Sequence, residues 1–333
     1  MTGQIIGHEW VMELLRRSLA VGKVSHAYLL TGPARIGKTT LALVLAQALN
    51  CEEPNPPCGQ CRSCIEIAER VHPDVHLIVG TGVADAIKIE QIRALQREAV
   101  LAPYRGRYKV FILRQMDQAT TEAANSLLKT LEEPPAHVIL CLTAVRPEAL
   151  PSTVVSRCQK LELRPATKDA VEAALLERGL TPSRASLLGH LSGGRVGWAV
   201  AASQDDSLMS QRSETLDRFL EILPEPRVAR LDFAWKASRN PESVRQQLGL
   251  WITWCRDLLL LCAGRENRVV NVDRIGDLRR LAGQVQLHEV QAVLQALNTT
   301  GEQLEANVNT RLALEGLFLK IPRWQTRVPD SVG

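Results

Sequence analysis

The sequence predicts an α/β domain that contains a parallel sheet, followed by all-α regions. Three observations favour this fold class. A phosphate-binding pattern stands between an apolar run and a helical pattern, and further apolar runs alternate with helical patterns through the first half of the chain. The second half carries apolar residues at helical spacing. Strands that alternate with helices are the signature of a parallel sheet covered by helices.

The first predicted strand leads into the phosphate-binding pattern. The run "HAYLLTG" at residues 26–32 reads as a buried strand, and "GPARIGKTT" at residues 32–40 fits the pattern G-x-x-x-x-G-K-[ST] at every position. The following "TTLALVLAQALN" at residues 39–50 predicts a helix. A strand before and a helix after are the context that this motif requires, so the sequence predicts a nucleotide-binding loop.

The chemistry of this loop follows from its residue types. Glycines permit a tight turn whose backbone N–H groups surround phosphate oxygens, the lysine supplies a positive charge, and the first threonine hydroxyl is suited to bind Mg²⁺. The N-terminal end of the next helix adds positive potential. ATP or ADP with Mg²⁺ is therefore the candidate ligand. The candidate nucleotide-binding residues are Gly32, Gly37, Lys38, Thr39 and Thr40.

A cysteine-rich segment comes directly after the loop helix. It contains Cys51, Cys58, Cys61 and Cys64, and the last three follow the pattern C-x-x-C-x-x-C. Thiolates at this spacing can converge on one tetrahedral Zn²⁺, and four protein ligands leave no open position for catalysis, so we predict a structural zinc site. Disulfides or unrelated thiols are the alternatives. The remaining cysteines stand in apolar or helical surroundings and are predicted to be packing residues: Cys141, Cys158, Cys255 and Cys262.

Three further strands and one helix complete the predicted sheet domain. Apolar runs at residues 75–79, 109–113 and 138–143 read as buried strands. Between the last two strands, "TTEAANSLLKTLEEPP" at residues 120–135 has its apolar residues at helical spacing. Two prolines end this helical pattern.

Changes in composition divide the rest of the chain. "LRPATKD" at residues 163–169 indicates a domain boundary, after which a short helical segment is interrupted by the glycines of "SGGRVG". The polar "SQDDS" at residues 203–207 makes a second break. Beyond it, apolar residues recur at helical spacing over residues 248–262 and 287–297. These patterns predict helices packed in a bundle.

Length, charge and hydropathy exclude several classes of protein. The chain has 333 residues, which is enough for two or three domains. Its formal net charge of +4 is too small to indicate a dedicated nucleic-acid-binding protein. No apolar run approaches the roughly 18 uncharged residues of a membrane span, and "MTGQIIGHEW" lacks the pattern of a secretory signal. These features predict a cytoplasmic protein, in which reduced cysteines favour a metal site over disulfides.

One stretch does not fit a site that hydrolyses ATP. Enzymes with this phosphate loop usually follow a later apolar strand with an acid that holds Mg²⁺. Here the apolar run ends in Arg114 and Gln115, and Arg114 puts a positive charge where Mg²⁺ would need a negative partner. Asp117 lies three residues beyond Arg114. It is either a shifted metal ligand or a surface or helix-capping residue.

Several segments resemble, in this order, the clamp-loader subunits of bacterial DNA polymerase III. They are "HAYLLTGPARIGKTT", the cysteine insertion, "ANSLLKTLEEPP" and "LPSTVVSRCQ". The resemblance covers residues 1–200 with specific motifs, whereas the later helices agree only in kind. "HPD" at residues 72–74 and the segment at residues 87–113 are more similar to the delta-prime subunits than to the gamma/tau motor subunits.

The resemblance implies an architecture. Clamp-loader subunits are AAA+ proteins with a zinc module, a small helical lid and a helical collar domain. It therefore implies an AAA+ nucleotide-binding domain at residues 1–165, with the zinc module at residues 51–64. A helical lid at residues 166–205 and an all-α collar domain for oligomerisation at residues 206–333 follow.

The resemblance also implies roles for single residues. The Asp-Glu pair of the motor subunits, which orients the metal and activates the attacking water, falls on Arg114 and Gln115. In "SRC", the family's arginine reaches into a neighbouring subunit's ATP site, so Arg157 takes the catalytic role of an arginine finger in trans. Thr143 matches the family's polar sensor position. The arginine of the second sensor falls on Gly197, with Arg195 close by, which argues against sensing in cis.

The resemblance favours a stator, meaning a clamp-loader subunit without ATPase activity of its own. Such a subunit would donate Arg157 to a motor subunit and help to load a sliding clamp on primed DNA. Its partners would be the gamma/tau motor subunits and the delta subunit, with the clamp and primer-template DNA engaged through the assembly, and no membrane.

Two alternatives remain open. An active gamma/tau-type motor ATPase is disfavoured by Arg114 and Gln115. A zinc-dependent nucleic-acid-binding protein is disfavoured because the zinc module lacks a nearby cluster of basic and aromatic residues. "YRGRYKV" at residues 104–110 is locally basic with two aromatic residues, and we predict a solvated loop that leads into a strand.

Overall fold

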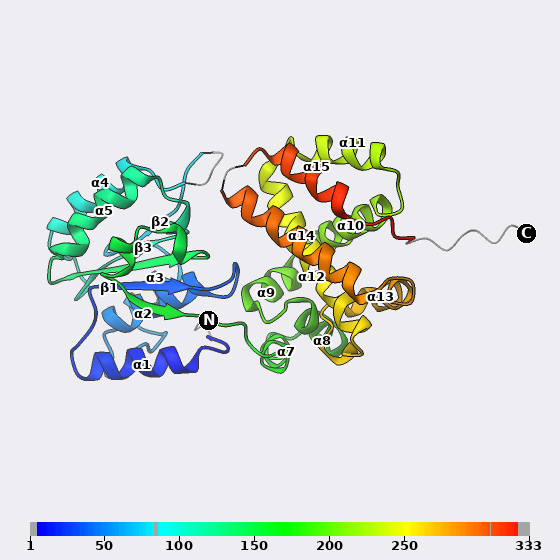
Figure 1. The fold of residues 1–333 in the computed structure, drawn as a ribbon. Helices are drawn as coiled ribbons and strands as arrows, with labels where there is room; N and C mark the ends of the chain where they lie inside the picture. Colours follow the sequence, from blue (N-terminus) through cyan, green and yellow to red (C-terminus); the bar gives the residue numbers. More distant parts are fainter. Residues whose placement is uncertain (1–4, 83–85, 307, 326–333) are drawn as a thin grey trace, which may run out of the picture. The chain divides into compact units, whose positions relative to one another are not determined.

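The structure, a computed structural model, describes residues 5–82, 86–306 and 308–325 (Figure 1). Contacts within the chain divide it into two units. The first runs to Ala174 and includes Gly194–Trp198, and the second comprises Leu175–Gly193 and the chain from Ala199 onward. The three domains expected at residues 1–165, 166–205 and 206–333 stay a prediction.

The first unit contains a five-stranded parallel sheet with the strand order β2-β3-β4-β1-β5. Its strands are β1 (Ala27–Thr31), β2 (Val75–Ile78), β3 (Lys109–Leu113), β4 (Val138–Ala144) and β5 (Gln159–Glu162). Every residue of β1, β3 and β4 is buried, as expected for a parallel sheet that is covered on both faces. The strands predicted around residues 26–32, 75–79, 109–113 and 138–143 are confirmed. We did not predict β5, because only Leu161 of its residues is buried and the strand carries no apolar run.

Helices cover both faces of this sheet (Figure 1). They are α1 (Glu9–Ala20), α2 (Lys38–Asn50), α3 (Arg62–Ala68), α4 (Ile89–Val100), α5 (Thr121–Glu132) and α6 (Ser152–Val155), with short 3₁₀ helices η1 (Met116–Gln118) and η2 (Pro147–Ala149). Side chains of β3 alternate between the faces. Val110 and Ile112 pack in a cluster with residues of α1 and α2, whereas Phe111 and Leu113 pack with residues of α4 and α5.

The second unit is built from helices, as predicted. Its elements are α8 (Pro182–Leu191), α10 (Ser207–Ile222), α11 (Arg227–Ala237), α12 (Pro241–Cys262), η3 (Glu266–Arg268), η4 (Val272–Arg274), α13 (Ile275–Ala282), α14 (Leu287–Glu305) and α15 (Thr310–Lys320). Two more helices, α7 (Lys168–Leu176) and α9 (Val196–Gln204), contribute residues to both units. Phe219 stacks on Trp251 with 4.8 Å between the ring centroids, and Phe318 meets Trp251 edge-on. These rings lie in the centre of an apolar core formed by α10, α12, α14 and α15.

In the part of the chain that the structure describes, no helix is both long enough and apolar enough to span a membrane.

Candidate functional site

The phosphate loop joins the end of β1 to the start of α2, and its glycines are required by the backbone. Gly32 has a φ of 138° and Gly37 a φ of 115°, conformations that side chains disfavour. A Cβ atom at Gly32 would also lie 2.4 Å from the carbonyl oxygen of Leu163. The loop therefore lies directly against the chain that follows β5.

Lys38 is the first residue of α2 and is buried. Its Nζ donates hydrogen bonds to the carbonyl oxygens of Gly32 (2.6 Å) and Pro33 (2.8 Å). Burial lowers the pKa of Lys38 to about 8, and the nearby carboxylate of Asp117 partly offsets this effect. The ammonium group is thus surrounded by oxygens of its own loop. Thr39, half-buried, and Thr40, exposed, lie in the same helical turn.

The end of β3 is where a motor subunit would carry its acids. Arg114 still pairs with β2, because its N–H donates to the carbonyl oxygen of Ile78. The alternation along β3 places Arg114 on the face of the sheet that α2 covers. Gln115 has a φ of 53°, and its N–H donates to the Thr143 hydroxyl at 3.0 Å. The polar side chain at the predicted sensor position therefore binds the backbone at Gln115.

Asp117 connects η1 to the loop that follows β4. Its Oδ2 accepts hydrogen bonds from the N–H groups of Val145 (3.2 Å) and Arg146 (3.1 Å). Its Oδ1 is buried, and no residue in the described part of the chain donates to it. The carboxylate therefore ties η1 to the segment that leads into η2, and both interpretations of Asp117, as a shifted metal ligand or as a surface or helix-capping residue, stay predictions.

Gly197, on which the resemblance places the second sensor, packs against the backbone of the phosphate loop. Gly197 lies in the first turn of α9, and a Cβ atom there would lie 2.7 Å from the carbonyl oxygen of Arg35 in the phosphate loop. Nearby, Ala166 donates its N–H to the carbonyl oxygen of Gly194 at 3.0 Å. The Arg195 guanidinium lies 5.9 Å from the ring centroid of Trp198. No side chain fits at position 197 without displacing the phosphate loop or α9.

Arg157 lies in the turn between α6 and β5, away from the phosphate loop of its own chain. In the parallel pairing of β5 with β1, Gln159 is opposite Tyr28, and Glu162 is opposite Thr31. The strand rises about 3.3 Å per residue, so the start of β5 and Gly32 are roughly 13 Å apart along the strands. Arg157 precedes β5 and is therefore at the opposite edge of the sheet from Gly32. Its side chain is 36% exposed.

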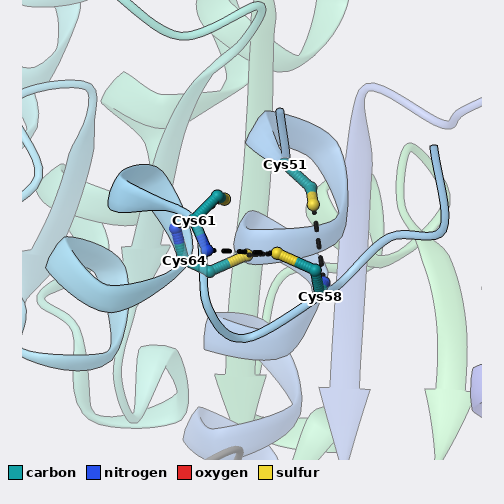
Figure 2. A group of neighbouring side chains, drawn as sticks. All are labelled: Cys51, Cys58, Cys61 and Cys64. Carbon is teal, nitrogen blue, oxygen red and sulfur yellow. Dashed lines mark hydrogen bonds between the residues drawn. The ribbon is translucent and has the colours of Figure 1, made fainter. Parts of the chain in front are cut away.

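The four cysteines of the predicted zinc module lie together between the end of α2 and α3 (Figure 2). Their sulfur atoms all lie within 4.8 Å of one another. Four sulfurs around Zn²⁺ at 2.3 Å would be about 3.8 Å apart, so the cluster has nearly the required size. All four are free thiols: Cys51, Cys58, Cys61 and Cys64.

Backbone N–H groups favour the thiolate of Cys58, whereas burial raises the pKa of the Cys51 and Cys64 thiols. The N–H of Cys61 donates to the Cys58 sulfur at 3.2 Å, and the N–H of Gln60 does so at 3.4 Å. These N–H groups lower the pKa of the Cys58 thiol to about 7. The N–H of Cys58 in turn donates to the Cys51 sulfur at 3.5 Å. Because the thiolate is the metal-binding form, the surroundings of Cys58 suit a metal ligand, and the set of four clustered sulfurs fits Zn²⁺.

Comparison with known proteins assigns the chain to a family. A family model described as "DNA polymerase III, delta subunit" matches residues 7–167, and one described as "DNA polymerase III, delta subunit, C terminal" matches residues 207–323. The DNA polymerase III subunit delta' of Bacillus subtilis is 33% identical over 317 residues, which cover 93% of this chain and 95% of that subunit. The chain belongs to the DNA polymerase III delta' family.

Related subunits match this chain to different extents. The DNA polymerase III subunit tau of Escherichia coli is 38% identical over 162 residues, which are 48% of this chain and 25% of tau. A solved structure of a gamma subunit-related protein from Thermotoga maritima superposes with a TM-score of 0.50 at 19% identity, covering 94% of this chain and 99% of that one. This likeness supports the AAA+ fold class.

Sequence reasoning missed the residues that support the exposed arginine and the loop before β3. Glu132 binds Arg157, yet the glutamates of "LEEPP" received no role. Asp74, in "HPD", accepts hydrogen bonds from the N–H groups of three consecutive loop residues, Tyr104, Arg105 and Gly106. The loop before β3 is therefore anchored through the backbone of residues 104–106, and the Tyr104 side chain is exposed as predicted, whereas Lys109 and Val110 are already buried residues of β3.

Proposed function

We propose that this delta' family member is a non-hydrolysing stator of a clamp loader, and that it donates Arg157 in trans to the ATP site of a neighbouring motor subunit. The observation that carries the proposal is the place of Arg157 in the sheet. It is half-buried and lies at the opposite end of the strands from Gly32, so its guanidinium is directed away from the phosphate loop of its own chain. An arginine finger supplied in trans is worth about 10³–10⁵ in rate in well-studied nucleotide hydrolases.

The chain's own phosphate loop supports the non-hydrolysing half of the proposal. Arg114 and Gln115 supply no acid at the end of β3, and Gly197 leaves no room for a second sensor. The loop keeps the residues suited to hold the phosphates of ATP or ADP: Gly32, Gly37, Lys38, Thr39 and Thr40. A nucleotide would have to replace the two carbonyl oxygens that now bind Lys38. Nucleotide binding here would therefore be structural.

We further propose that Cys51, Cys58, Cys61 and Cys64 bind one structural Zn²⁺. The four sulfurs hold α3 against the end of α2, and a closed set of four ligands leaves no position for a substrate. The proposed partners are gamma/tau-type motor subunits and a delta subunit. The sliding clamp and primer-template DNA would be engaged by the whole assembly.

The decisive experiment is a reconstitution with the motor and delta subunits, the sliding clamp and primed DNA. We expect Arg157→Ala to leave the chain folded and the assembly intact. ATP hydrolysis at the site of the motor subunit next to this chain should be abolished, while hydrolysis at the other motor subunits continues. Arg93→Ala, which removes an exposed arginine from α4, is the matched control and should have no effect. If the assembly that contains Arg157→Ala hydrolyses ATP at the wild-type rate, Arg157 has no role in trans.

A further inference from the structure

The guanidinium of Arg157 is held at two points by two different elements. Its Nη2 lies 2.7 Å from Oε1 of Glu132, the last residue of α5. Its Nη1 donates to the carbonyl oxygen of Thr153 in α6 at 3.0 Å. One contact is a charged carboxylate and the other a neutral carbonyl. Together they fix both terminal nitrogens of the side chain.

The backbone around Arg157 is also fixed. The N–H of Arg157 donates to the carbonyl oxygen of Val154, and the N–H of Cys158 donates to that of Val155. Val154 is completely buried, and Cys158 packs against the same apolar cluster as α5. The pair therefore connects side chains whose backbones belong to one packed region, so that its geometry is set by the fold.

The electrostatics at the end of α5 favour a cation at this place. The C-terminal end of a helix carries negative partial charge, and carboxylates there are unfavourable unless a cation compensates them. Glu132 and Glu133 are both at this end. Glu132 is paired with Arg157, whereas no hydrogen bond or ion pair involves the Glu133 side chain in the described residues.

The two contacts leave donors free for a further ligand. A guanidinium has five N–H groups, and the contacts to Glu132 and Thr153 use one on each terminal nitrogen. The remaining N–H groups suffice for bidentate binding of a phosphate. An arginine that is already oriented loses less freedom when it binds a phosphate than one that samples many rotamers.

We propose that Glu132 is a positioning residue for Arg157: it orients the guanidinium so that its free N–H groups are presented to the neighbouring subunit's nucleotide. This inference rests on the proposed role of Arg157 in trans. Glu132 itself does not touch the nucleotide. Its effect passes entirely through Arg157.

The test uses the complete reconstituted assembly with primed DNA. We expect Glu132→Ala to lower the kcat of ATP hydrolysis by about three- to tenfold and to leave KM unchanged, because a misplaced finger weakens only transition-state contacts. Glu132→Gln, which keeps an oxygen acceptor, should restore most of the rate. Glu133→Ala, with the same change next to the pair, is the matched control and should match the wild type.

A double variant decides whether the two residues act as one unit. Arg157→Ala combined with Glu132→Ala should be no slower than Arg157→Ala alone, because Glu132 has no role once the guanidinium is gone. Glu132 is half-exposed, so thermal unfolding of Glu132→Ala should match the wild type. A wild-type or raised rate for Glu132→Ala, or a further loss in the double variant, would overturn the positioning role.

Failure of this inference is distinguishable from failure of the stator proposal. If Arg157→Ala slows hydrolysis but Glu132→Ala does not, only the positioning role falls. If Arg157→Ala has no effect, the role in trans falls, and any effect of Glu132→Ala then contradicts the inference as well.

Discussion

At the scale of single residues, Asp74 shows how a buried carboxylate can organise a loop. Asp74 is 1% exposed, and its two oxygens accept N–H groups from Tyr104 (2.6 Å), Arg105 (2.8 Å) and Gly106 (2.8 Å). Burial alone raises the pKa of Asp74, but these three donors outweigh burial, and the pKa lies below its usual range. The charged form is therefore the one that holds the loop.

We expect Asp74→Ala to lower the free energy of unfolding by about 2–4 kcal/mol, because three N–H groups lose a charged acceptor. The amides of residues 104–106 should exchange hydrogen faster. Because the folded pKa is depressed, the stabilisation is present above pH about 4 and is lost as the pH falls through the folded pKa. Urea unfolding of the full chain checks this over a range from about pH 3 to about pH 7, which spans the ordinary pKa of an aspartate. Glu69→Gln, a change at an exposed carboxylate, is the control. Unchanged exchange at these amides in Asp74→Ala would contradict it.

At the scale of elements, residues 51–64 connect α2 to α3 with no strand and only the first turn of α3. Glu52 Oε1 accepts the hydroxyl of Ser63 at 2.7 Å, and the Gln47 side chain donates to the carbonyl oxygen of Cys64 at 2.7 Å. These bonds fix the two ends of the segment. The central part, which includes Cys58, depends on the sulfur cluster.

We expect the purified chain to contain about one zinc ion, because four thiolates complete a structural site. Cys58→Ser should reduce the zinc content and increase hydrogen exchange within residues 51–64, while the sheet stays protected. Cys262→Ser, a change of the same kind in α12, should keep the metal. Elemental analysis and hydrogen exchange together test this, and a natively folded chain that contains no metal would contradict it.

The sequence predicted an element well where residues close together in the chain determine it, and poorly where contacts between distant residues do. Strands such as β3 are buried on both faces, so their apolar runs are visible in the sequence, whereas β5 is held at the sheet edge by backbone pairing and shows only Leu161 to the core. The phosphate loop and cysteine cluster were predicted because their spacing encodes their chemistry. Asp74 and Tyr104 are 30 residues apart in the chain, and Glu132 and Arg157 are 25 residues apart. The spacing of apolar residues carries no information about such distant pairs.

At the scale of the whole molecule, the chain has the fold of a motor subunit, but the resemblance places a motor's acids and second sensor on residues of other types. By resemblance, the acids of the motor subunits fall on Arg114 and Gln115, and their second sensor falls on Gly197. Arg157 precedes β5, at the opposite end of the strands from Gly32. In the role that we propose, the chain contributes to hydrolysis only through its place beside a motor subunit.

We expect the purified chain to show negligible ATP turnover, and the double variant Arg114→Asp with Gln115→Glu to remain inactive. The acids alone would not suffice, because neither a second sensor nor a neighbour's arginine completes the site. A phosphate-release assay measures both proteins, with the motor subunit as the positive control. Turnover that is abolished by Lys38→Ala would show that the loop still supports hydrolysis.

The contact between Gly197 and Arg35 bears on how such a chain could evolve. Exchanges at Arg114 and Gln115 replace one half-buried side chain with another, but any side chain at position 197 first requires α9 or the phosphate loop to move. A substitution of Gly197 would therefore first disrupt the packing between α9 and the phosphate loop, before any ATPase activity could be gained. If the chain is a stator as we propose, this packing penalty makes the gain of a side chain at position 197, and with it a return to motor activity, a costly step.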